Sequence, residues 1–180
     1  LVVTDPADPD PRTWTALLPE DPQAVLEDYA ILDDLDRPVL VATWTRHAIS
    51  EVSVHDLATG ERTGTVDLPG LGSVGGLSER PEGGHETWFG YTDHTTPGRV
   101  LRYDAVSGRI TTWAESPGAV DVPDVSTQQV SYRSADGTEV RMVIVSPDRR
   151  PGRPRPTVLY GYGGFNVSLT PAYSASILAW

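Results

Sequence analysis

A pattern of apolar strands ending in aspartate recurs about every 50 residues in the first two thirds of the chain. Three apolar-alternating runs each end in an Asp, at positions 5, 56 and 104, so the spacings are 51 and 48 residues. A turn and a second strand-like run follow each Asp. Periods of about 40 to 50 residues with several short strands each are typical of β-propeller blades. The spacing therefore predicts propeller blades over residues 1–118, with the three Asp residues in structural roles at equivalent hairpin turns.

The segments between these hairpins are predicted to be the inner strands of the blades. Residues 39–44 and 88–92 begin 49 residues apart and are rich in β-branched and aromatic side chains. Residues 25–32 have the composition of a helix, but their place in the repeat predicts a strand. Three aspartates within residues 33–36 then indicate a solvated turn, because a calcium loop needs a tighter ligand spacing and a closing carboxylate.

The repeat stops near residue 118, where a polar linker begins. Apolar runs on either side of Asp136-Gly137 predict a β-hairpin. An exposed connection rich in Arg and Pro follows, and then a buried strand that begins at Thr157. This order is typical of the entry into an α/β-hydrolase domain. We therefore expect two domains: all-β propeller blades over 1–118, and the N-terminal portion of an α/β-hydrolase domain over 119–180.

The strand at Thr157 runs into a loop in which glycines alternate with aromatic residues, residues 160–166. In an open α/β sheet, ligands bind beyond the carboxyl ends of such strands. Peptide N–H groups and a Tyr hydroxyl placed there can stabilise a developing oxyanion, which is a large catalytic effect. The same spacing also fits an ordinary glycine-rich turn with Tyr and Phe in the core.

The residues of this loop resemble a known family. Residues 159–166, Leu-Tyr-Gly-Tyr-Gly-Gly-Phe-Asn, are similar to the oxyanion-loop segment of the prolyl oligopeptidase family of serine peptidases, and the resemblance extends upstream through the blades. It implies a seven-bladed propeller joined to an α/β-hydrolase domain, and an endopeptidase that hydrolyses short peptides on the carboxyl side of proline. It assigns oxyanion stabilisation to Tyr162, and to Phe165 a place in the pocket that binds the substrate proline.

The catalytic triad of such an enzyme is expected outside this sequence. Its Ser, Asp and His come after the oxyanion loop, but only fifteen residues follow Phe165 and all four histidines precede it. The chain is therefore expected to be an internal piece of a longer enzyme, with the rest of the parent chain as a partner and no peptidase activity alone. Two alternatives stay open: a related oligopeptidase that cleaves after Arg or Lys, whose loop usually lacks Phe at position 165, and a non-catalytic propeller binding module.

Charge and composition restrict the partners. The net charge of −11 argues against nucleic acid and anionic membranes, which bind basic surfaces. Short proline-containing peptides remain the expected ligands. The absence of cysteine excludes disulfides and thiolate metal sites. A cytoplasmic location is expected, with secretion or a periplasmic location left open.

Other candidate motifs are interpreted as structural, and no cofactor or metal is expected. Ser73 does not lie on a nucleophile elbow, because Leu71 stands where that motif requires Gly. His85-Glu86 and Asp93-His94 flank a predicted strand without the helical His-Glu-x-x-His spacing of a zinc site, so they are expected to be ordinary surface polar residues.

Overall fold

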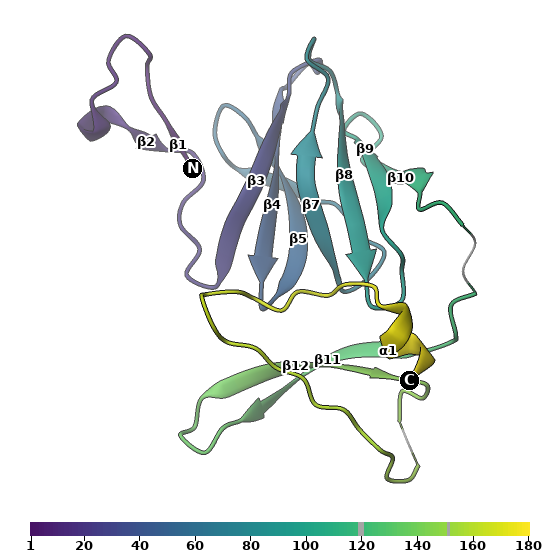
Figure 1. Ribbon diagram of the computed structural model, residues 1–180. Helices are drawn as coiled ribbons and strands as arrows, with labels where there is room; N and C mark the ends of the chain where they lie inside the picture. The colour runs from purple at the N-terminus through teal and green to yellow at the C-terminus, as the bar shows by residue number, and fades with distance from the viewer. Residues whose placement is uncertain (119–120, 151) are drawn as a thin grey trace.

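Two four-stranded antiparallel sheets form most of the computed structural model, which describes residues 1–118, 121–150 and 152–180 (Figure 1). In each sheet the strands pair in chain order, so each is a meander. The first sheet consists of β3 (Ala24–Leu32), β4 (Val39–Arg46), β5 (Ile49–Asp56) and β6 (Arg62–Thr65), and the second of β7 (Gly72–Ser78), β8 (Glu86–Asp93), β9 (Arg99–Asp104) and β10 (Arg109–Glu115). Consecutive four-stranded meanders are the blades of a propeller, which confirms the prediction from the repeat.

The turns after Asp56 and Asp104 are equivalent. Asp56 Oδ1 accepts hydrogen bonds from the N–H groups of Ala58 and Thr59, and Asp104 Oδ1 accepts from the corresponding N–H groups two and three residues on. The backbone carbonyls of both aspartates accept from Gly60 and Gly108, at 2.9 and 2.8 Å. This part of the repeat prediction is confirmed.

Asp5 follows the same plan only in part. It lies just after β1 (Val2–Val3), and its Oδ1 accepts from the Ala7 N–H at 2.8 Å. The chain then passes through a proline-rich loop and a short 3₁₀ helix (Pro11–Thr13) before β2 (Thr15–Ala16) pairs with β1. Pro9 occupies the position where the other two turns place a glycine in the left-handed conformation, which proline cannot adopt, so the same tight turn does not form here.

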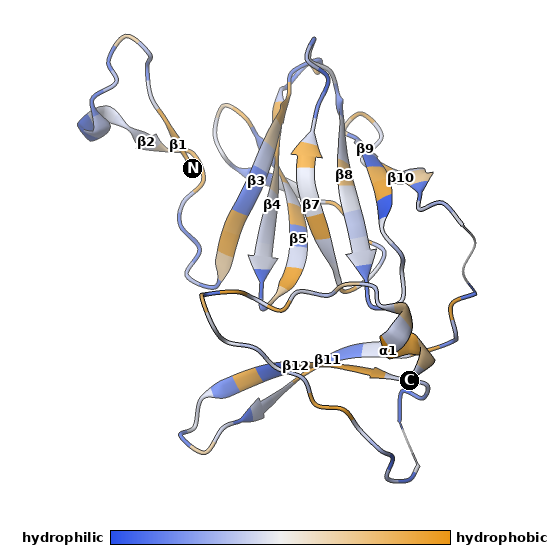
Figure 2. Cartoon of the chain, in the orientation of Figure 1, coloured by the Kyte–Doolittle hydropathy of each residue, from blue (hydrophilic) through white to orange (hydrophobic). Residues whose placement is uncertain are grey.

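The core lies between the two blades. Strand β4 alternates, with Val41 facing the β7–β10 sheet while Leu40 and Ala42 face the N-terminal segment around Leu18. Because both faces of this part of β4 are covered, its first four residues, 39–42, are all apolar, whereas its second half is more polar (Figure 2). The principal cluster of buried side chains comprises Leu32, Val41, Val52, Val54, Val66, Phe89, Tyr91, Leu101 and Tyr103.

Residues 24–32 form a strand, as the repeat predicted against their helical composition. Pairing with β4 on one edge fixes the extended backbone, and tertiary context of this kind overrides helix propensity. The turn that follows exposes Asp33, Asp34 and Asp36 to solvent, as expected. Asp33 Oδ1 also accepts a hydrogen bond from the Gly84 N–H of the neighbouring blade, at 3.2 Å.

The described residues after 120 form a hairpin and a short helix. Strands β11 (Ser126–Arg133) and β12 (Glu139–Ser146) pair around Gly137, whose φ is 86°, so the predicted hairpin is confirmed. Gln129 Nε2 on β11 donates to the His47 carbonyl at the β4–β5 turn, at 2.8 Å. Helix α1 (Ala175–Ala179) begins after the N-cap Ser174. Within the described ranges, no helix has the length and apolar character needed to cross a membrane.

The buried strand expected at Thr157 is not formed. Residues 157–160 have no regular structure, and the side chains of Val158 and Leu159 are 67% and 82% exposed. A β-strand is held by hydrogen bonds to a neighbouring strand, and no described strand pairs with this segment. The structure therefore shows no α/β-hydrolase sheet among the described residues, and the division of the chain at residue 118 stays a prediction.

Candidate functional site

The glycine-rich loop presents both predicted site residues to solvent. Tyr162 is half exposed and Phe165 is 96% exposed. The Val167 N–H donates to the Gly164 carbonyl at 3.1 Å, which closes a turn with Phe165 and Asn166 at its centre. Their φ values are 54° and 57°, in the left-handed region. A bulky residue such as Phe rarely adopts this conformation, and strain of this kind is concentrated at functional sites.

Gly164 brings the Tyr162 ring close to the backbone of the loop. A Cβ atom at Gly164 would lie 2.8 Å from the Tyr162 hydroxyl oxygen, so no other residue fits without displacing the ring. Within the described ranges the Tyr162 hydroxyl has no hydrogen-bond partner in the protein. The loop thus displays a phenolic donor and an apolar ring on a short backbone, and these groups can bind an anion and an apolar ligand group.

Asp93 is not a surface residue as predicted, because it is 8% exposed at the end of β8. Its carboxylate accepts hydrogen bonds from the Tyr91 hydroxyl at 2.8 Å and from the N–H groups of Thr95 and Thr96 at 2.8 and 2.7 Å. Burial alone would raise the pKa of Asp93, but these hydrogen bonds outweigh it and hold the pKa below its ordinary value. The same burial raises the pKa of Tyr91, which stays protonated as the donor.

The neighbouring polar residues are also structural. Burial lowers the pKa of His94, against the attraction of the Asp93 carboxylate. The Glu86 side chain is largely buried and forms ion pairs with Arg80 and Arg102, both at 3.2 Å, so it too departs from the prediction of a surface residue. The sequence carried no signal for the burial of Glu86, because its partners Arg80 and Arg102 lie outside β8. Across the described part of the chain, no three His, Cys, Asp or Glu side chains converge as a metal site would need.

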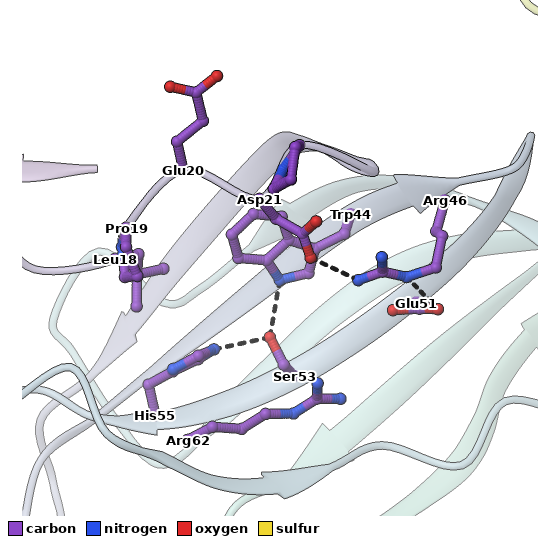
Figure 3. Close-up of a pocket in the computed structure, with 11 residues that line it drawn as sticks. Leu18, Pro19, Glu20, Asp21, Trp44, Arg46, Glu51, Ser53, His55 and Arg62 are labelled. Carbon is purple, nitrogen blue, oxygen red and sulfur yellow. Dashed lines mark hydrogen bonds and ion pairs between the residues drawn. The ribbon is translucent and has the colours of Figure 1, made fainter.

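A Ser–His pair that the sequence did not reveal lies in a cavity of about 290 Å³ beside the first blade (Figure 3). Ser53 Oγ lies 2.8 Å from His55 Nε2 and accepts a hydrogen bond from Trp44 Nε1 at 2.8 Å. His55 Nδ1 lies 3.0 Å from the Gly60 carbonyl, which can only accept, so Nδ1 carries the proton and Nε2 accepts from Ser53. Residues 53 and 55 share one face of β5, and that alternation is the signal that could have identified the pair.

This pair does not form a nucleophile. Ser53 is buried, and its oxygen and proton are both used within the blade. The nearby Arg46 is also internally paired, with Asp21 at 2.7 Å and Glu51 at 3.0 Å. The hydrogen bond from Arg46 lowers the pKa of Asp21. Each of these groups already has a partner, so the arrangement stabilises the blade and leaves none of them unpaired for a ligand.

Four-stranded meanders pack face to face, and an exposed glycine-rich loop follows them. This arrangement defines a β-propeller protein with an appended segment. The family is then clear: residues 1–116 match the model of the prolyl oligopeptidase N-terminal β-propeller domain. The chain belongs to the prolyl oligopeptidase family, which confirms the resemblance found in the sequence.

Known relatives are similar along nearly the whole chain. A prolyl endopeptidase of Elizabethkingia miricola is 30% identical over 100% of this chain, and a prolyl oligopeptidase of Omphalotus olearius is 33% identical over 91%. These alignments cover 24% and 22% of the two relatives, so the chain spans about a quarter of their length.

Solved structures show the same fold. A structure from a study of two prolyl endopeptidases superposes with a TM-score of 0.80 at 33% identity, over 99% of this chain and 26% of that one. Prolyl oligopeptidase B from Galerina marginata, bound to a 35mer hydrolysis and macrocyclization substrate, superposes with a TM-score of 0.78 at 24% identity, over 98% of this chain and 24% of that one. Neither comparison tests the roles of Tyr162 and Phe165, which stay predictions.

Proposed function

We propose that this chain is part of a serine-type endopeptidase that hydrolyses short peptides on the carboxyl side of proline. The observation that carries the proposal is the similarity to a prolyl endopeptidase over the whole chain, the glycine-rich loop included. The Ser, Asp and His of the triad would be supplied by the rest of the protein, and the propeller would restrict access to short, unstructured peptides.

In this proposal Tyr162 stabilises the tetrahedral intermediate. When the Ser attacks the carbonyl carbon of the substrate proline, the carbonyl oxygen gains negative charge and needs hydrogen-bond donors. The Tyr162 hydroxyl, half exposed and without a protein partner in the described residues, supplies one. A peptide N–H group supplies another. The donors act on charge that exists only at this stage, so they lower the barrier without tightening substrate binding.

Phe165 forms the wall against which the substrate proline packs. Its ring is almost fully exposed on a strained turn, so it offers apolar surface that a bound pyrrolidine ring would remove from water. Charge also favours proline over Arg or Lys at the cleaved position. The segment 149–180 contains four arginines and no Asp or Glu. A cationic side chain would find no carboxylate there to pair with.

Two substitutions in the intact protein test the proposal, with a peptide that carries proline at the cleaved position and its alanine analogue as substrates. Tyr162→Phe should lower kcat about 10² to 10³-fold, equivalent to about 3 kcal/mol, and leave proline preference intact. Phe165→Ala should mainly raise KM for the proline peptide and reduce discrimination against alanine. Tyr160→Phe is the matched control and should leave kcat unchanged. Equal kcat in the Tyr162→Phe variant and the unmodified protein would remove the oxyanion assignment.

A further inference from the structure

Two hydroxyl groups at one end of the second blade bind the backbone of the segment that follows the glycine-rich loop. Ser73 and Thr92 are directly opposite each other in the β7–β8 ladder. Ser73 Oγ donates to the Pro171 carbonyl at 2.6 Å, and Thr92 Oγ1 accepts from the Tyr173 N–H at 3.3 Å. One cross-strand pair therefore contacts one carbonyl and one N–H of the same short segment.

The blade side of this contact is held in place by hydrogen bonds and close packing within the blade itself. The Thr92 hydroxyl donates to the Thr96 carbonyl at 2.9 Å, which leaves its lone pairs for Tyr173. The buried Asp93 carboxylate holds the turn that carries Thr96. Beside Ser73, a side chain at Gly72 would collide with the Tyr91 ring and the Thr92 carbonyl, so the strands approach closely only with glycine there.

The segment side is held at two residues, Pro171 and Tyr173. Pro171 is fully buried, in contrast to the exposed residues before it. The Pro171 carbonyl accepts from the Ser73 hydroxyl, and the Tyr173 N–H donates to Thr92. Figure 1 shows this last stretch of chain, in yellow, running along the ends of the blade strands where β8 finishes.

The docked segment and the loop are joined by only the five residues between Phe165 and Pro171. Local hydrogen bonds tighten this connection, from the Val167 N–H to the Gly164 carbonyl and from the Thr170 N–H to the Ser168 carbonyl. A short connection with internal bonds allows little independent movement. The position of Pro171 on the blade therefore restricts where Tyr162 and Phe165 can lie.

We propose that the Ser73–Thr92 pair is a docking site of the propeller for residues 171–173, and that it positions the 160–166 loop for the reaction. The positioning role rests on the proposed function, whereas the docking itself does not. Ser73 and Thr92 are positioning residues in this scheme and do not touch the substrate. They act by holding the far end of the loop that carries Tyr162.

Hydrogen exchange in the intact protein tests the docking without reference to activity. Thr92→Val and Ser73→Ala should each speed exchange of the Tyr173 amide and of the hydrogen-bonded amides of Val167 and Thr170 roughly tenfold. Thr87→Val is the matched control, because Thr87 lies on the same strand and its hydroxyl donates to the Ser78 carbonyl within the blade, at 3.1 Å. The control should leave these amides unchanged. Unaltered exchange at Tyr173, Val167 and Thr170 in both docking variants would overturn the docking site.

Kinetics separates the positioning role from a purely structural one. If the loop is displaced, Thr92→Val and Ser73→Ala should lower kcat for a proline peptide roughly tenfold with a smaller change in KM, and Thr87→Val should change neither. Faster exchange with unchanged kcat would overturn the positioning role. A protein that cleaves no proline peptide at all would contradict the proposed function, and the exchange of Tyr173 would still decide the docking.

Discussion

At the scale of single residues, Gly60 and Gly108 occupy the same position of the repeat. Both allow a turn with positive φ, but only Gly60 also lies in close contact with another segment. Both lie four residues after the blade aspartate and have positive φ, 72° and 68°. A Cβ atom at Gly60 would overlap the backbone carbonyl of Leu17, whereas at Gly108 the described residues place no heavy atom beyond its chain neighbours within 4 Å. The turn at Gly60 therefore also packs against the N-terminal segment.

Alanine substitution should separate these two roles. Gly108→Ala should lower the free energy of unfolding by about 1–2 kcal/mol, the cost of a left-handed conformation for a residue with a Cβ. Gly60→Ala should cost about 1–3 kcal/mol more, because the backbone of Leu17 must also move. Urea denaturation of the two variants measures the difference. Equal losses would mean that the Leu17 contact does not contribute to stability.

At the scale of elements, an aspartate on β3 ties the two blades together. Asp28 lies at a bulge in the pairing of β3 with β4, and its Oδ2 accepts from the Leu77 N–H of β7 at 2.9 Å. Leu77 borders a bulge in β7, where the ladder with β8 is interrupted. The carboxylate thus replaces a backbone partner that the bulge removes.

Removal of this acceptor should weaken the contact between blades. Asp28→Ala leaves the partly buried Leu77 N–H without its partner and should lower the free energy of unfolding by about 1–3 kcal/mol. Asp28→Asn keeps an oxygen acceptor and should cost less. Denaturation midpoints, together with exchange of the Leu77 amide, check the result. An Asn variant as unstable as the Ala variant would show that charge matters here more than the hydrogen bond.

The sequence predicted correctly those strands whose apolar pattern recurs about every 50 residues along the chain. Strand β3 could be predicted against its helical composition from its place in the repeat, whose inner strands begin 49 residues apart, at residues 39 and 88. The burial of Asp93 was not predicted. Its partners Tyr91, Thr95 and Thr96 lie within three residues of it along the chain, so the local pattern Tyr-x-Asp-x-Thr-Thr is the signal that could have indicated a carboxylate held in its own turn. The expected strand at Val158 failed for another reason: an apolar run predicts burial only where other strands can cover it.

At the scale of the whole molecule, the blades bury much of their apolar surface, whereas the segment around Val158 leaves its apolar surface exposed. The two blades enclose a shared core, including Val41 and Phe89, which are 1% exposed or less. By contrast, Val158, Leu159 and Tyr160 form a continuous exposed run without ladder partners among the described strands. Such a run is a template for pairing with another chain. The propeller portion should therefore fold around its own core while this run promotes association.

A pair of matched substitutions tests this division in the 180-residue chain produced alone. Val158→Lys should reduce self-association, because a charge interrupts the apolar run and opposes intermolecular strand pairing. Val106→Lys is the control, since Val106 is 68% exposed against 67% for Val158 but lies in the turn after β9. Both changes are at exposed sites and should leave the free energy of unfolding within about 0.5 kcal/mol. Sedimentation velocity across a range of concentrations measures the association. If the two variants associate equally, then net charge controls association, and the exposed run at Val158 has no special part in it.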